Sequence, residues 1–127
     1  MISIILIFFA GICNAIMDVL HYRFSKSIFT KCKNQQWIDP DISHQNKWKY
    51  VDGMWVGEKF FGSSTFLVWL TDFWHFVKFL MLLFLSAAIV FYNPIVNWWA
   101  DLLIMYCTFT ITFELFFSKV LVKRKNI

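Results

Sequence analysis

Three long apolar stretches, separated by one polar segment and one short link, most constrain what this chain can fold into. They cover residues 1–20, 64–92 and 95–122, and the first carries a single charge, at Asp18. About 20 apolar residues in a helix are enough to cross the hydrocarbon core of a bilayer. The chain is 59% hydrophobic and only 16% charged, and 127 residues are too few to bury so much apolar surface in a globular core. The sequence therefore predicts an all-α integral membrane protein.

We expect one membrane domain over residues 1–127, with transmembrane helices at 2–21, 64–92 and 95–122. Ser64 is a suitable N-cap for the second helix, and Asn93-Pro94 favours its end at residue 92. A signal peptide is the alternative for the first stretch, but no Lys or Arg precedes Arg23. The absence of a basic segment favours an uncleaved helix.

Residues 22–62 form the one polar connector. Phe24, Ile28, Phe29 and Cys32 recur at helical spacing among lysines, which favours an amphipathic helix over residues 24–33 lying on the membrane surface. A solvated connector with scattered apolar residues is an equally good interpretation. The stretch 48–61 is rich in aromatic residues and lysine, which gather at the level of the lipid headgroups.

The distribution of basic residues predicts the orientation in the membrane. Seven of the 12 lie in the connector, four lie in or beside the basic tail at 123–127, and only Lys78 lies within the second helix. The link between the second and third helices has none. By the positive-inside rule, the connector and the C-terminus are cytoplasmic and Met1 is outside a plasma or inner membrane. We therefore expect the basic residues behind the net charge of +4 to bind anionic lipid headgroups on the cytoplasmic side, and not nucleic acid.

Polar side chains interrupt all three predicted helices. Asp18 and His21 are three residues apart, as are Asp72 and His75, and Glu114 lies in the third helix. Ionisable groups within a span normally face the interior of the helix bundle or a wet cavity. Counted at 1.5 Å per residue from the outer ends of straight helices, these five side chains fall at similar depths near the cytoplasmic leaflet. We therefore expect them to form one cluster, with Asn14, Thr110 and Lys78 as supporting residues.

One hypothesis for this cluster is a metal site. Carboxylates and imidazoles on facing helices are the ligands of di-iron bundles and of zinc sites, so Zn or Fe is the candidate cofactor. The predicted metal ligands are Asp18, His21, Asp72, His75 and Glu114. A metal-bound water at this depth would be placed to attack a lipid or its headgroup, with Glu114 as the catalytic general base.

The main alternative is a non-catalytic membrane protein. In that case the Asp–His pairs only bridge helices, and the protein acts through a partner or as a homo-oligomer, which would help a thin three-helix bundle to bury its polar groups. A haem held by His21 and His75 is disfavoured, because the two side chains are expected one helical turn apart in depth. His44, in the connector, is expected to be solvated.

Overall fold

The structure is a computed structural model that describes residues 1–124, and it is mostly helical. Its three long helices are α1 (Ile2–Tyr22), α4 (Phe73–Val90) and α5 (Trp98–Leu115), and a π-helical turn over Phe116–Val120 lengthens α5. With 21, 18 and 23 residues, these three helical segments are long and apolar enough to cross a membrane. The prediction of three helices long and apolar enough to span a membrane is confirmed.

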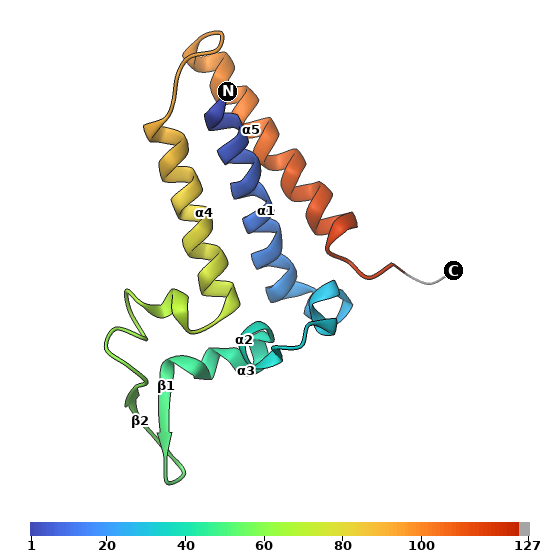
Figure 1. Cartoon of the computed structure of the whole chain (residues 1–127). Helices are drawn as coiled ribbons and strands as arrows, with labels where there is room; N and C mark the ends of the chain where they lie inside the picture. The colour runs from blue at the N-terminus through green and yellow to red at the C-terminus, as the bar shows by residue number, and fades with distance from the viewer. Residues whose placement is uncertain (125–127) are drawn as a thin grey trace.

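Helix α1 lies between α4 and α5 and packs against both (Figure 1). Near the connector, its buried residues Ala15, Val19 and Leu20 contact Phe29 of the connector and Leu121, which follows the last helical turn. Further along the helix, another set of buried α1 side chains packs against α4. Among the long helices in the described part of the chain, only α1 packs against both of the others, which is why most of the core residues belong to it.

The approach of α1 to α5 depends on Gly11. A Cβ atom built on Gly11 would lie 2.9 Å from the backbone oxygen of Phe109 and 3.1 Å from the Cβ of Thr112. A residue without a side chain lets two helix backbones approach closely. Because Thr112 is buried against α1, this contact also fixes which face of α5 points into the molecule.

Helix α4 is shorter than predicted, and its expected bounds of 64 and 92 are wrong. The preceding residues form turns, in which the carboxylate of Glu58 accepts hydrogen bonds from the backbone N–H groups of Gly62 and Ser64. The hydrogen bond from the Ser64 hydroxyl, followed by that from Gly62, holds the pKa of the Glu58 carboxyl below its usual value. Ser64 is therefore engaged with Glu58, and the N-cap of the helix is Asp72.

The third helix is also shorter than the predicted 95–122. Asn97 caps α5 through its side-chain oxygen, which accepts from the N–H of Ala100 at 3.0 Å. The buried carboxylate of Asp101 accepts from the Tyr92 hydroxyl at 2.9 Å and from the N–H groups of Ile95 and Val96 at 2.9 and 3.1 Å. These bonds hold the link as a loop and delay the start of the helix to Trp98. For the first helix, the predicted bounds of 2–21 agree with α1 to within one residue.

The connector contains short elements, and the predicted surface helix over 24–33 is wrong. Two 3-10 helices, Phe24–Lys26 and Ile28–Lys31, are separated by an extended Ser27. The backbone of this segment bonds to the end of the chain instead of continuing a helix, with Ile28 N–H donating to the oxygen of Leu121 at 3.0 Å. Short helices follow: α2 (Gln35–Ile38), α3 (Pro40–Ser43) and 3-10 helices at His44–Lys47 and, after the strands, at Val68–Leu70.

Two strands correct the all-α description. Strands β1 (Trp48–Val51) and β2 (Met54–Glu58) pair antiparallel, and their hairpin extends away from the long helices (Figure 1). The turn residues Asp52 and Gly53 have φ angles of 50° and 84°, the left-handed conformation that Asp-Gly favours in two-residue hairpins. Of the predicted basic tail at 123–127, residues 125–127 lie outside the described part of the chain.

Candidate functional site

The start of α4 is built around Asp72. Its backbone is extended, and its Oδ1 atom accepts a hydrogen bond from the N–H of His75 at 3.0 Å, which is the usual N-cap interaction. The Thr71 hydroxyl lies 3.1 Å from Asp72 Oδ2. Asp72 is 2% exposed, and the hydrogen bonds of its carboxylate come from Thr71 and His75.

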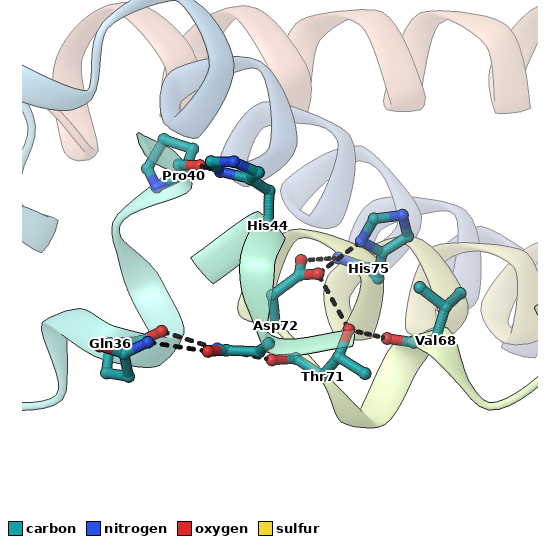
Figure 2. A network of polar contacts seen from close by, with 8 residues as sticks. Gln36, Pro40, His44, Val68, Thr71, Asp72 and His75 are labelled. Carbon is teal, nitrogen blue, oxygen red and sulfur yellow. Dashed lines mark hydrogen bonds and ion pairs between the residues drawn. The ribbon is translucent and has the colours of Figure 1, made fainter. Parts of the chain in front are cut away.

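The imidazole of His75 is the closest partner of this carboxylate. His75 Nδ1 lies 2.7 Å from Asp72 Oδ2, and Figure 2 shows the two side chains facing each other. Because an ionised carboxylate only accepts hydrogen bonds, Nδ1 carries the proton, and in the neutral ring Nε2 is then the free acceptor. The pair lies within one helical turn, so it caps α4 and does not bridge α4 to α1.

Burial and hydrogen bonding act in opposite directions on Asp72. Burial raises the pKa of the carboxyl, but the hydrogen bonds from the His75 ring, the His75 N–H and the Thr71 hydroxyl outweigh it and hold the pKa below its usual value. Asp72 is therefore ionised at neutral pH and fixes the orientation of the His75 ring.

A pocket of about 250 Å³ opens beside this pair, and we call it the histidine pocket. Its lining contains all three histidines of the chain, contributed by the end of α1, the connector and the first turn of α4; the lining residues are His21, Pro40, Ser43, His44, Asp72, Trp74 and His75. Three segments far apart in sequence thus meet at the connector end of the long helices. Near this pocket, the Lys78 ammonium lies 5.3 Å from the ring centre of Trp74.

His44 lines this pocket and is exposed, as its position in the polar connector predicted. Its Nδ1 lies 3.1 Å from the backbone oxygen of Pro40, so this nitrogen also carries the proton (Figure 2). The connector is held against the start of α4 by Asn46, whose amide donates to the backbone oxygen of Thr71 at 3.0 Å. His44 is exposed and no spacing pattern links it to the Asp–His pairs, so only the folded connector identifies it.

The structure does not assemble the five predicted site residues into one cluster. His21, Asp72 and His75 line the same pocket, whereas Asp18 is half-buried on α1 and is not among the lining residues. Glu114 is exposed on α5, where it accepts a hydrogen bond from Ser118. Within residues 1–124, no three His, Cys, Asp or Glu side chains are arranged so that they could hold a metal ion.

The supporting residues separate in the same way. Asn14 is half-buried on α1, and the Thr110 hydroxyl donates to the Tyr106 oxygen of its own helix at 2.6 Å. The separation has two causes. Helix α4 begins at Phe73, which places Asp72 and His75 at its start, and the contact of Thr112 with Gly11 turns Glu114 away from α1.

Comparison with known proteins gives no relative from which a function could be inferred, so any functional proposal depends on the fold and the histidine pocket. The chain matches no protein-family model, no curated protein and no solved structure. By length and composition, it is a mostly helical protein with three candidate membrane spans, a connector hairpin and a histidine pocket at the connector end.

Proposed function

We propose that the protein crosses a plasma or inner membrane three times, with the connector and C-terminus in the cytoplasm and Met1 outside. The connector joins α1 and α4 at one end of the long helices, and the link of residues 91–97 joins α4 and α5 at the other (Figure 1). The connector holds seven basic residues and this link holds none. Basic segments are retained in the cytoplasm.

Reporter fusions test this orientation. Green fluorescent protein fused after residue 127 is expected to fluoresce, because it folds in the cytoplasm, and alkaline phosphatase fused after Asn93 is expected to be active, because it folds outside. As a control, each fusion site also receives the other reporter. An active phosphatase after residue 127 would contradict the proposed orientation.

We further propose that the histidine pocket binds and acts on the phosphate-containing headgroup of a lipid in the cytoplasmic leaflet. The pocket lies where α1 ends and α4 begins, which is the boundary of two candidate spans. The His21 ring and the nearby Lys78 ammonium are suitable donors to a phosphate, whereas the ring N–H groups of His44 and His75 already bond to Pro40 and Asp72. Asp72 is the one carboxylate that lines the pocket, and it is buried and hydrogen-bonded to His75 in the first turn of α4.

The Asp72–His75 pair is the single observation that carries this proposal. A carboxylate that holds Nδ1–H of an imidazole leaves Nε2 free to accept a proton from a water molecule or a hydroxyl group. We therefore assign acid–base chemistry to His75, in the role that the sequence suggested for Glu114. Candidate substrates are the ester and phosphoester bonds of a lipid headgroup, because the proposed orientation puts the pocket at the cytoplasmic end of two spans, where these bonds are expected.

Isotope-labelled histidine gives a direct test, because all three histidines of the chain line the pocket. In nuclear magnetic resonance spectra of the micelle-bound protein, neutral His44 and His75 are expected as Nδ1–H tautomers. Glycerol phosphate is expected to shift the imidazole signals, whereas ethanolamine, which has no phosphate, leaves them in place. In Asp72→Asn, which keeps an N-cap but removes the charged acceptor that fixes the orientation of the His75 ring, the glycerol phosphate affinity is expected to fall about tenfold.

The matched control is Asp39→Asn, since Asp39 caps α3 without lining the pocket. Equal shifts with both probes, or an unchanged affinity in Asp72→Asn, would rule out the headgroup proposal.

A divalent metal, Zn or Fe, is our second candidate for this pocket. Histidines that bind metals usually donate the other ring N–H to a carboxylate or a backbone oxygen, as both His75 and His44 do. Among residues 1–124, no three side chains are already placed to bind a metal ion. A bound metal would therefore require the histidine rings to move closer together, or water molecules to complete the coordination. Zinc added to the same labelled sample decides this: loss of the Nε2 acceptor signals at one equivalent supports it, and unchanged signals exclude it.

A further inference from the structure

One face of α5 has no neighbour among residues 1–124. Thr112 and Asp101 are buried and mark the face that points inward. About a quarter turn around the helix from that face lies a strip of residues spaced three or four positions apart, which we call the outer face of α5: the exposed Ile104, Cys107, Ile111, Glu114 and Leu115 and the half-buried Thr108 and Ser118. This is the spacing by which a helix packs along a partner helix.

Exposure of this face to lipid would cost free energy, because it carries the ionisable side chain of Glu114. It lies six residues before Val120, the end of the candidate span, which is about 9 Å along the helix axis. Its hydrogen bond from Ser118 satisfies one carboxylate oxygen, and no Lys or Arg among residues 1–124 forms an ion pair with it. Carboxylates within spans are normally paired with another side chain.

Lys119 supplies the complementary charge five residues later. Two copies of one membrane protein have the same orientation, so their α5 helices would run parallel. In a parallel helix pair, residue g of one helix lies beside residue e of the following heptad on the other, which is five positions further along. With Glu114 at g, Ile104 and Ile111 fall at d, and Thr108 and Leu115 fall at a. Lys119, five positions beyond Glu114, lies in the π-helical turn and lines the same surface groove as Glu114 and Ile111.

We propose that two copies of the chain associate through the outer face of α5. Ile111 and Leu115 pack across the two-fold axis, and Glu114 of each copy pairs with Lys119 of the other. The interface is isologous, because the same patch contributes both the carboxylate and the ammonium. A second copy supplies both the apolar contacts and the cation that Glu114 lacks, whereas the hydrocarbon chains of lipids supply only the first. The association is independent of the histidine pocket.

Cysteine crosslinking in proteoliposomes tests the proposal. In a Cys107→Ser background, Ile111→Cys is expected to give a disulfide-linked dimer on mild oxidation, because position d lies near the axis of the pair. Tyr106→Cys is the matched control, since Tyr106 and Ile111 are both 67% exposed but Tyr106 falls at position f, on the far side of the seam. Equal crosslinking at the two positions, or none at Ile111→Cys, would overturn the proposal.

Charge exchange provides a second measurement that does not use oxidation. Glu114→Lys is expected to weaken association in the bilayer about three- to tenfold, measured as the dimer fraction by single-molecule photobleaching. Combining it with Lys119→Glu is expected to restore the dimer, because the pair is re-formed with opposite signs. A dimer fraction that is unchanged in Glu114→Lys, or not restored in the double variant, contradicts the Glu114–Lys119 pairing.

Discussion

Asp72→Ala is expected to lower the free energy of unfolding by about 2–3 kcal/mol. Loss of the N-cap accounts for about 1 kcal/mol, and the rest comes from the charge-assisted hydrogen bond that His75 loses. Asp72→Asn is expected to retain most of the capping contribution, because asparagine caps helices about as well as aspartate. Detergent-titration unfolding followed by circular dichroism measures both variants. The control is Asp39→Ala, which removes the cap of the four-residue helix α3 and is expected to cost less.

The contribution of the Asp72 charge depends on pH. Because the pKa of this carboxyl is lowered in the folded protein, the ionised form contributes stability that is fully present above the unfolded-state pKa, about 3.9. That contribution is lost as the pH falls through the lower folded-state pKa. The stability difference between wild type and Asp72→Asn is therefore expected to shrink in acid below about pH 4. A difference that grows on acidification, or an Asp72→Ala variant as stable as wild type, would refute this account of Asp72.

Gly11→Leu is expected to destabilise the protein by about 2–3 kcal/mol, as overpacking of a tight contact does. The first side-chain atom would already lie 2.9 Å from the backbone oxygen of Phe109, which cannot move without shifting α5. Gly11→Ala is expected to have a smaller effect of the same sign. Spin labels on α1 and α5 would report a larger separation of the two helices.

Ser86→Leu is the matched control for Gly11→Leu, because Ser86 lies within a candidate span and is exposed. It is expected to leave the free energy of unfolding unchanged or slightly higher. If Gly11→Leu unfolded like Ser86→Leu in the same detergent titration, the close contact between α1 and α5 would not be important for stability.

Local sequence signals were present for some features that our sequence analysis missed. Asp52-Gly53 is the usual signal for a two-residue hairpin and predicts the β1–β2 turn, yet the connector was expected to be helical or irregular. Asp72, three residues before the N–H that it caps, is as good an N-cap as Ser64. The choice between them depended on Glu58, which engages Ser64 from the end of β2, a contact that no helical periodicity can reveal.

Length and hydropathy determined the three long helices, because an apolar stretch of this length can satisfy its backbone hydrogen bonds in a membrane only within a helix. The same reasoning identified His21, Asp72 and His75 as unusual polar residues in apolar surroundings. The tertiary structure alone decided which polar residues meet. The folded connector brings His44 to the pocket through contacts distant in sequence, and the approach at Gly11 sets the rotation of α5. That rotation places Glu114 on the outer face, because the side of α5 that contacts Gly11 is the side that becomes buried.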